Sequence, residues 1–561
     1  MLIKFLKFVL ILLFYQTPLY SKSKTLKDFN SHNLSNYFSG IVAHGNKNNS
    51  EALKFFRSSS YLINKHEPYL ERYVYSLVLE NKVKQAINEI KRNLTENNSN
   101  FYEAYIILVL DSLKKKDFKK SKNYLDQSYK FIKNDRYALI IYETLKQYLY
   151  VFEENKIPKS KKKLGNLSFI NEVFQRCYLG DKNTQVYFQK LINIKSDIDY
   201  SRYIFFSINH LVENNKFIEA QDAINNLDYL STTLLISQGK KWIEEKKFKE
   251  FSKIFSCKNS NDAIGEFFFL VANLYSSNKN YDKSNFYLNI SHYLNPKFKF
   301  NLSLLADNYY LNDNYEKAKK ILKYFNKKDN FYYWFKIRKQ TGIISKELSD
   351  VEALNFINTE FKKIKDPSIN ILFDIANFNK NSKKYQNAIN YYDKIISKID
   401  FDLIFYPEIL YNRGSSYERL GNYLKSDRDL LKSLEINPDD AYVLNYLAYS
   451  WLEREYKIDS ALRMLEKAYV IRSNDPYIID SIGWAYYLVD DFLKAETFLK
   501  RAVELMPEDP IVNDHYGDIL WKLDRKIQAR YFWTSVLNLK ETKDKMKKNI
   551  NIKLIKGLKV S

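Results

Sequence analysis

The chain has 561 residues, which is too long for one hydrophobic core because single cores stop growing at about 250–300 residues. It contains only 12 Gly and 10 Pro, which argues against a β-sandwich or β-barrel, since these folds need a turn roughly every 8–12 residues. The net charge of +23 is uneven: residues 407–540 hold 18 Lys and Arg against 22 Asp and Glu, the tail 541–561 holds 7 against 2, and residues 1–406 carry the remaining +22. We therefore expect an all-α array whose two parts attract partners of opposite charge.

Residues 1–23 have the layout of a secretory signal peptide. Lys4 and Lys7 precede an apolar run from Phe8 to Tyr15. The segment Ser21-Lys22-Ser23 then provides the small residues that a signal peptidase accepts. The apolar run is shorter than the ~20 residues that cross a bilayer, so an uncleaved anchor is the alternative rather than the main interpretation. The sequence predicts export to the periplasm, or to the periplasmic face of the envelope, of a Gram-negative bacterium.

Residues 24–130 contain pairs of residues that recur with a fixed spacing. The members of each pair are twelve residues apart and successive pairs are 34 and 35 residues apart: Gly40 with Ala52, Val74 with Ala86, and Val109 with Ser121. A period of 20–50 residues is typical of stacked helical repeats. We expect divergent helix pairs in this part of the chain.

The pattern is weaker over residues 131–262. Only Ile208, Phe217 and Ala220 stand in register there, so we expect degenerate helical repeats. A lysine-rich stretch at 156–163, which contains Pro158, is typical of a linker or exposed turn.

Two cysteines, Cys177 and Cys257, lie in this degenerate part and are 80 residues apart. That distance is more than two repeats, and a disulfide needs Cα atoms within about 7 Å of each other. We therefore expect two buried free thiols, with a disulfide as the alternative that an oxidising compartment would allow.

Repeats reappear over residues 263–406 and are partly degenerate. One repeat runs from Gly265 to Phe298 and has Ala272, Tyr275, Ser284 and Pro296 in register. The next repeat, 34 residues further on, has Ala306, Tyr309 and Ala318 at the matching positions. A diverged repeat follows, with Ala376 and Ala388 in register. We place the main domain boundary at 400–407, where the charge changes sign.

Residues 407–540 hold four well-formed units. With Pro407 as position 1, small residues recur at position 8 as Gly414, Ala448, Gly483 and Gly517, and at position 20 as Ser426, Ala461, Ala495 and Ala529. Two antiparallel helices can approach closely only where one side chain is small, so these positions predict the contact within each helix pair. Proline at position 32 in Pro438 and Pro507 closes the second helix. The basic residues of 541–561 then predict a capping helix with a polar outer face.

This pattern resembles the tetratricopeptide repeat family, and the resemblance is strongest over 407–540. It implies an α-solenoid of antiparallel helix pairs that wind into a superhelix. In the family, positions 2, 5, 6, 9, 12 and 13 of the first helices line a concave groove. The residues at such positions that we expect to bind a partner are Tyr411, Asn412, Tyr442, Asn445, Tyr446, Tyr449, Tyr477, Asp480, Trp484, Asp514, Asp518 and Trp521.

The chemistry of this groove favours a basic or amide-rich ligand, because Asp480, Asp514 and Asp518 lie among Tyr and Trp anchors. Some of the aromatic residues are instead expected to pack between repeats. One branch of the family grips a carboxylate with lysines and arginines, but here the matching positions hold Asn and Asp. Asp427 with Asp429, and Glu453 with Glu455, are interpreted as solvated surface charges.

No motif in the sequence indicates catalysis, and an enzyme would require an unrecognised site in residues 131–262. Six histidines are not paired at metal-ligand spacing, and there is no phosphate-binding glycine loop or nucleophile motif, so no metal, cofactor or enzymatic activity is expected. The main hypothesis is a scaffold that binds a protein or peptide in the groove, while the basic N-terminal part contacts a second partner or an anionic envelope surface. The alternative is an accessory subunit for envelope polymer or outer-membrane protein biogenesis. Nucleic-acid binding is not expected, because the aromatics of the basic part occupy packing positions.

Overall fold

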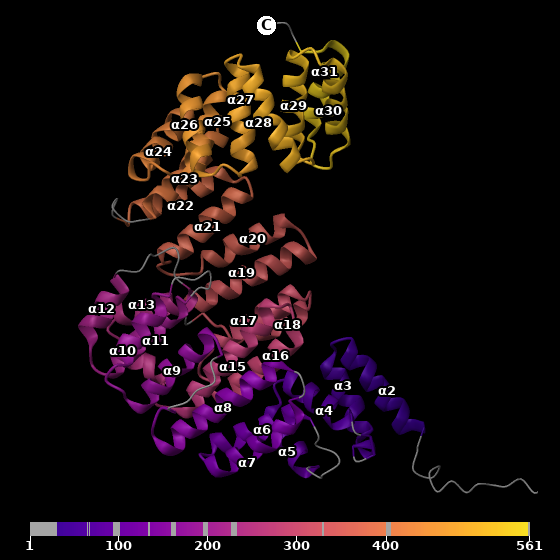
Figure 1. Cartoon of the computed structure of the whole chain (residues 1–561), viewed down its shortest axis with the longest axis vertical. Helices are drawn as coiled ribbons and strands as arrows, with labels where there is room; N and C mark the ends of the chain where they lie inside the picture. The colour runs from indigo at the N-terminus through magenta and orange to yellow at the C-terminus, as the bar shows by residue number, and fades with distance from the viewer. Residues whose placement is uncertain are drawn as a thin grey trace, which may run out of the picture. The chain divides into compact units, whose positions relative to one another are not determined.

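The structure is a computed structural model that describes residues 31–558 apart from 64, 67, 94–100, 133–134, 159–163, 195–199, 226–232, 328–329 and 400–404. The predicted signal peptide lies outside the described residues. In the described residues the regular structure is helical, with one isolated bridge between Leu164 and Asn166. The predicted all-α solenoid of antiparallel helix pairs is confirmed (Figure 1).

The chain forms two compact units, one of residues 1–226 with 233–332 and one of residues 227–232 with 333–561. The helices of the first unit are α2 (Ser31–Gly45), α3 (Asn49–Ser58), η1 (Ser60–Leu62), α4 (Pro68–Leu79), α5 (Val83–Arg92), α6 (Tyr102–Lys114), α7 (Phe118–Ser128), η2 (Tyr129–Phe131), α8 (Arg136–Glu154), α9 (Asn166–Leu179), α10 (Thr184–Ile192), α11 (Arg202–Glu213), α12 (Phe217–Asn225), α13 (Leu234–Glu244), α14 (Lys249–Ile254), α15 (Ser260–Ser277), α16 (Tyr281–Leu294), α17 (Asn301–Leu311) and α18 (Tyr315–Leu322).

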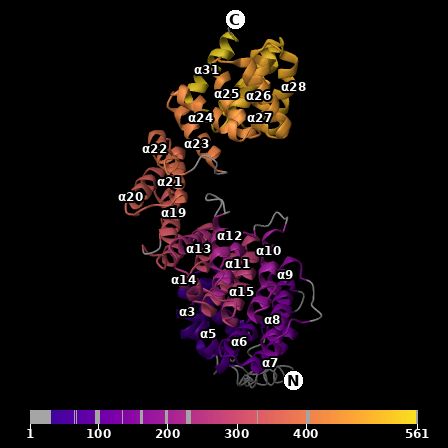
Figure 2. The ribbon, with the colours of Figure 1, turned by 90° about the vertical axis from the view of Figure 1, so that its left-hand side faces the viewer.

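The second unit begins near the start of α19 and ends with α31 (Figure 2). Its helices are α19 (Asn330–Glu347), α20 (Asp350–Phe361), α21 (Ile369–Asn381), α22 (Tyr385–Ile396), α23 (Tyr406–Arg419), α24 (Tyr423–Ile436), α25 (Ala441–Leu452), α26 (Ile458–Ile471), α27 (Pro476–Leu488), α28 (Phe492–Leu505), α29 (Pro510–Lys522), α30 (Lys526–Asn538) and α31 (Asp544–Lys556). The boundary between the units, at Tyr332–Tyr333, follows packing and differs from the 400–407 boundary predicted from charge.

A tight turn with one left-handed residue joins the helices of most pairs. The residue seven positions after Gly40, Val74, Val109 and Ile208 has a positive φ, as the repeat register requires; these residues are Lys47, Asn81, Lys116 and Asn215. The second helix then starts at a polar cap; in the repeat at 407–440, for example, the Asn422 side chain accepts from the backbone N–H of Lys425. The same turn occurs at Lys246 between α13 and α14, a helix pair that no repeat register in the sequence predicts.

The small residues of the well-formed units let the helices of each pair approach closely, as predicted. A Cβ on Gly483 would lie 2.7 Å from Leu499 Cγ, and a Cβ on Gly517 would lie 2.5 Å from the Trp533 ring. Ala495, at position 20 of the third unit, is completely buried. Position 8 therefore contacts the large residue at position 24 of the second helix, and the apolar core runs continuously from pair to pair.

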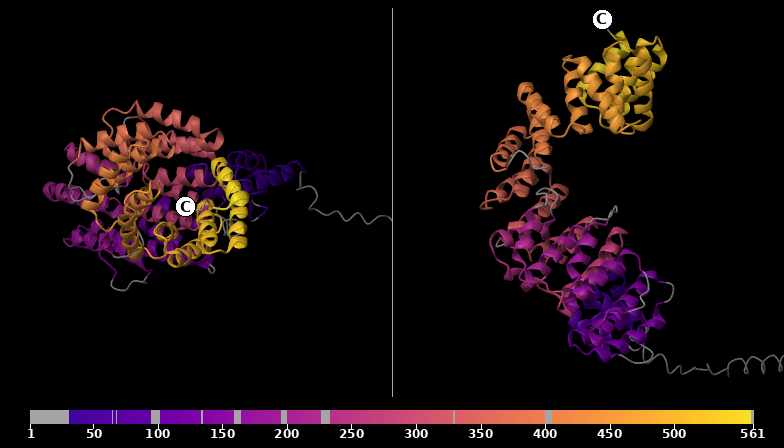
Figure 3. Two further views of the ribbon diagram at one scale, coloured as in Figure 1. Left: turned by 90° about the horizontal axis from the view of Figure 1, so that it is seen from above. Right: turned by 60° about the vertical axis from the view of Figure 1, so that its left-hand side comes forward.

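The first unit closes on itself, because its last helix pairs pack against its first ones. Helix α16 contacts α4 and α5, and α15 contacts α6, α8 and α9. The indigo, purple and magenta helices of this unit gather into one compact body (Figure 3, right). Lys283 of α16 forms an ion pair with Glu103 of α6 at 2.5 Å, and the Phe286 ring stacks on Tyr75 with centroids 4.5 Å apart. The inner faces of the N-terminal pairs are thus occupied by helices of the same unit.

The expectation of two free thiols is wrong, since Cys177 and Cys257 form a disulfide with their Cα atoms 5.7 Å apart. Only in a linear solenoid are residues 80 apart in sequence also far apart in space. Helix α9, which carries Cys177, instead packs against α15, whose preceding loop carries Cys257. The closure of the first unit brings the two cysteines together.

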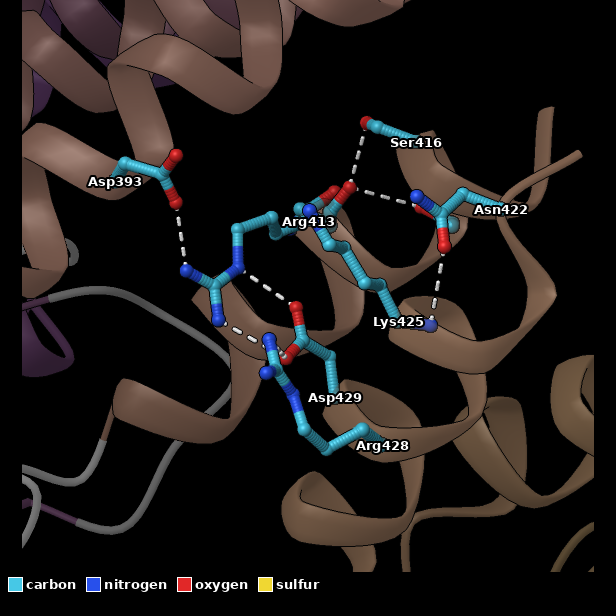
Figure 4. A network of polar contacts seen from close by, with 9 residues as sticks. Asp393, Arg413, Ser416, Asn422, Lys425, Arg428 and Asp429 are labelled. Atoms are coloured by element: carbon cyan, nitrogen blue, oxygen red, sulfur yellow. Dashed lines mark hydrogen bonds and ion pairs between the residues drawn. The ribbon is translucent and has the colours of Figure 1, made fainter. Parts of the chain in front are cut away.

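The interpretation of Asp429 as a solvated charge is also wrong. Asp429 is 2% exposed and accepts two hydrogen bonds from Arg413, at 2.7 and 2.9 Å, while Arg413 also donates to Asp393 at 2.7 Å (Figure 4). Burial opposes the charge of Arg413, but these two carboxylates outweigh it and raise its pKa. The network ties α22, α23 and α24 together, and Asp427 similarly pairs with Arg454 at 2.8 Å.

Candidate functional site

The first helices of the well-formed repeats line a pocket of about 240 Å³ in the second unit. Helices α23, α25 and α27 and the start of α29 supply its walls. Its lining residues are Glu418, Arg419, Asn445, Tyr446, Tyr449, Ser450, Glu453, Tyr477, Asp480, Ser481, Asp509, Ile511 and Val512. The structure therefore brings together five of the residues predicted to bind a partner, namely Asn445, Tyr446, Tyr449, Tyr477 and Asp480.

Two tyrosines of α25 form the aromatic floor of the pocket. The Tyr446 hydroxyl donates to Glu418 Oε2 at 2.9 Å, and the Tyr449 hydroxyl interacts with Glu453. Burial, reinforced by the adjacent carboxylate in each case, raises the pKa of both phenols. The two rings therefore stay neutral and offer apolar surface beside fixed polar atoms.

Two polar atoms in the pocket are buried without a hydrogen-bond partner among the described residues. They are Asn445 Oδ1 and Ser450 Oγ, both on α25. Buried polar atoms in native proteins are nearly always paired, and leaving one unpaired costs about 1–3 kcal/mol. Both atoms have almost no exposed surface, so they do not themselves offer acceptors to a ligand in the pocket.

The charge of the pocket is negative, because four carboxylates face one guanidinium. Arg419 lies 3.3 Å from Glu418, and Asp509 accepts from two backbone N–H groups at the start of α29. No ion pair of Glu453 occurs among the described residues. The local potential therefore favours a cationic ligand.

Asp480 has a partner inside the protein, because it lies 3.1 Å from His515 Nδ1. Burial opposes protonation of His515, but the carboxylate of Asp480, helped by Asp514 and Asp518, raises the His515 pKa. The His515 ring also stacks on Trp484 with centroids 4.2 Å apart. Trp484 is thus engaged between repeats rather than in the pocket.

Three predicted residues lie outside the pocket on the side of α21 and α26. Lys380 donates to Asn412 Oδ1 at 2.8 Å and lies 5.3 Å from the centre of the Tyr411 ring. Burial, with Arg419 nearby, lowers the Lys380 pKa to about 8. Tyr442 is half-exposed and lies under the Arg472 guanidinium at 4.7 Å.

The last three predicted residues contact helix α31 of the same chain. Lys553 Nζ lies 2.6 Å from Asp514 and 2.7 Å from Asp518, and Trp521 packs so closely on Gly557 that a Cβ there would overlap the ring. Burial and the neighbouring Asp514 raise the Asp518 pKa to about 6. The predicted capping helix is present, and it neutralises two carboxylates that the sequence assigned to a ligand.

Eight residues of the pocket wall were not predicted from the sequence: Glu418, Arg419, Ser450, Glu453, Ser481, Asp509, Ile511 and Val512. Five of them stand at concave positions of the repeat and could have been found: Ile511 at position 2, Ser481 at position 6, Glu418 at position 12, and Arg419 and Glu453 at position 13. Ser450, Val512 and the cap residue Asp509 fall outside those positions, so the repeat register carries no signal for them.

Comparisons with known proteins agree with this architecture. The family model of the tetratricopeptide repeat matches residues 407–440. A TPR repeat-containing protein of Pseudomonas aeruginosa is 30% identical over 116 residues, which span 20% of this chain and 20% of that protein. A TPR repeat-containing protein of Methanocaldococcus jannaschii is 25% identical over 418 residues, or 70% of this chain and 68% of that protein. The match thus spans only about a fifth of the length of the first relative.

Solved structures with some similarity include a thermophilic TPR protein of Thermus thermophilus, with 16% identity and a TM-score of 0.29, which covers 34% of this chain and all of that one. MamA of Desulfovibrio magneticus has 21% identity and a TM-score of 0.27, and covers 31% of this chain and 97% of that one. None of the described helices is both long enough and apolar enough to cross a membrane. The family match places a tetratricopeptide repeat at 407–440, and both of these relatives are TPR repeat-containing proteins.

Proposed function

We propose that this protein is a non-catalytic scaffold of the cell envelope that binds a partner protein or peptide in the pocket between α23 and α29. The observation that carries the proposal is the lining of the pocket, in which four carboxylates and three tyrosines surround one arginine. Basic side chains of a peptide are the cations that such a site lacks. The tyrosines would supply the apolar contact area.

The charge of the pocket supports a partner segment with Lys or Arg. Four carboxylates against one arginine give a net negative potential, and a cationic side chain would gain most beside Glu453, which has no ion pair among the described residues. The same chain provides an internal example one repeat further on, where Lys553 lies between Asp514 and Asp518.

An envelope location is supported by the signal-peptide pattern of residues 1–23 and by the disulfide. Disulfides persist in oxidising compartments and are rare in the cytosol. N-terminal sequencing of the protein from fractionated cells tests this part of the proposal. A mature chain that starts near Lys22–Lys24 in the periplasmic fraction would support it, and an intact Met1 in the cytosol would contradict it.

The binding proposal is tested with two matched tyrosine variants. Tyr477 lines the pocket and is 62% exposed, whereas Tyr531 is 70% exposed on α30 and lies outside the pocket. Both should fold like the parent when each is changed to Ala. Peptide arrays with Lys, Arg, Glu or norleucine at the central position are then probed with each purified full-length protein.

The expected result is that Lys and Arg peptides bind the parent and Tyr531→Ala, and bind Tyr477→Ala at least about tenfold more weakly, which corresponds to about 1.4 kcal/mol. Glu453→Gln should reduce the preference for cationic peptides without affecting the norleucine series. Equal binding by the parent and Tyr477→Ala, or a preference for Glu peptides, would refute the proposal.

A further inference from the structure

A third side chain, that of His210, lies at the Cys177–Cys257 disulfide, and the disulfide does not explain why the imidazole lies there. His210 of α11 has its Nδ1 3.4 Å from Cys177 Sγ, and the three ligand atoms of Cys177, His210 and Cys257 all lie within 4.8 Å of one another. Both cysteines are at least 96% buried and His210 is partly buried. A cystine sulfur is a weak hydrogen-bond acceptor, so its contact with the imidazole stabilises this position of the ring only weakly.

The distances fit a tetrahedral metal site instead. With Zn–S bonds of about 2.3 Å and Zn–N bonds of about 2.0–2.1 Å, a sulfur and a nitrogen ligand lie about 3.5 Å apart and two sulfurs lie about 3.8 Å apart. The Cys177 Sγ to His210 Nδ1 distance already matches. Cα atoms 5.7 Å apart leave room for the two sulfurs to separate by side-chain rotation once the S–S bond is broken.

We propose that the reduced chain binds a zinc-type divalent cation through Cys177 Sγ, Cys257 Sγ and His210 Nδ1. Exchange with a small-molecule disulfide would replace this metal site by the Cys177–Cys257 disulfide, as the added disulfide is reduced to two thiolates and the cation is released. Reduction by a phosphine breaks the S–S bond, gives two thiols and converts the phosphine to its oxide with oxygen from water. Binding of the cation then releases two protons as the thiols become thiolates. Two thiolates balance the charge of the cation, and soft sulfur with imidazole is the donor set that zinc prefers.

The chain around the cluster can accommodate this exchange. Asn214 Nδ2, 3.3 Å from His210 Nδ1, donates to that nitrogen in the disulfide form. Asn214 also donates to the His210 carbonyl at 2.7 Å, so its amide keeps a partner when the cation takes the imidazole nitrogen. The cluster links α9, α11 and the loop before α15. The same three segments would therefore be cross-linked in either redox state.

Cobalt(II) is the probe for the test, since thiolate coordination gives an intense charge-transfer absorption and tetrahedral geometry gives visible bands. Full-length protein reduced with a phosphine should bind one equivalent of Co2+ with both signals, and zinc should displace them. The oxidised protein should show neither. His210→Ala should weaken cobalt binding by at least about tenfold and change the visible bands.

The matched control is His292→Ala, because His292 is another partly buried histidine of the first unit. It should bind cobalt like the parent. Circular dichroism shows whether each variant is folded, and the histidine pair keeps the test valid even if cysteine variants do not fold. Reduced, folded parent without a thiolate–cobalt band would overturn the proposal, as would a His210→Ala variant that titrates like the parent.

Discussion

Replacing Asp518 by Asn should remove a pH dependence from the stability of the second unit. Asp518 is 5% exposed, and burial together with Asp514 raises its pKa to about 6 from an unperturbed 3.8. Between about pH 4 and pH 6 the folded state therefore binds more protons than the unfolded chain, so this group lowers the free energy of unfolding as the pH rises. A difference of about two pH units corresponds to about 3 kcal/mol.

The variant is matched to this purpose because Asn keeps a carbonyl oxygen that can accept from Trp533 Nε1, as Asp518 does at 3.0 Å, and Lys553 keeps Asp514. Unfolding in urea, followed by tryptophan fluorescence at several pH values, gives the difference between variant and parent. That difference should shift by about 3 kcal/mol in favour of the variant between pH 4 and pH 7, or by about 6–12 °C in Tm for a unit of this size.

The control is Asp524→Asn, because the Asp524 side chain is 84% exposed and its ion pair with Lys526, at 2.7 Å, lies on the surface. It should follow the parent at every pH, within the small contribution of a surface ion pair. If the free energies of unfolding of the parent and of Asp518→Asn differ by the same amount at every pH between 4 and 7, the assignment of a raised pKa to this buried carboxyl is refuted.

Two further changes test the packing of the repeats. Lys553→Met leaves Asp514 and Asp518 without this cation and should lower the free energy of unfolding of the second unit by about 3–5 kcal/mol. The decrease should be smaller at pH 5 than at pH 8, because Asp518 takes up a proton at the lower pH. Equal decreases at both pH values would contradict this. Gly483→Ala places a Cβ 2.7 Å from Leu499 Cγ and should cost about 1–3 kcal/mol in urea unfolding, whereas Gly45→Ala, with nothing within 4 Å, should not destabilise. Unchanged stability of Gly483→Ala would count against the close approach at position 8.

The helix pairs could be predicted from the sequence because each pair needs the same small contacts. Gly414 and Gly483 show this directly, since a Cβ on either would touch the facing leucine of its second helix. Gly239 was missed although it also allows a close approach, to Phe205 of the preceding helix pair and to Phe251, because it follows Ile208 by 31 residues rather than 34. A change in the length of a linker hides a register that the packing preserves.

The site was harder to predict because a repeat register places residues on a face but does not say what covers that face. Tyr449 and Tyr477 line the pocket, whereas Asp514 and Asp518, on the same face, are covered by α31. The prediction of two free thiols was wrong for the same reason, since the spacing of the repeats does not show that α9 packs against α15. Both features depend on contacts between helices that are far apart in the sequence, and the repeat register does not predict such contacts.

The closure of the first unit has a consequence for how this protein can evolve. In an open array each repeat contacts only its neighbours, so a repeat can be lost or duplicated and the array simply becomes shorter or longer. Here Lys283 and Phe286 of α16 must meet Glu103 and Tyr75, which lie about 180 and 211 residues earlier in the chain. Gain or loss of one repeat between them would misalign both contacts, so the number of repeats in this unit is fixed. In the described part of the second unit the main helix contacts join neighbouring pairs, which leaves that unit free to change in length.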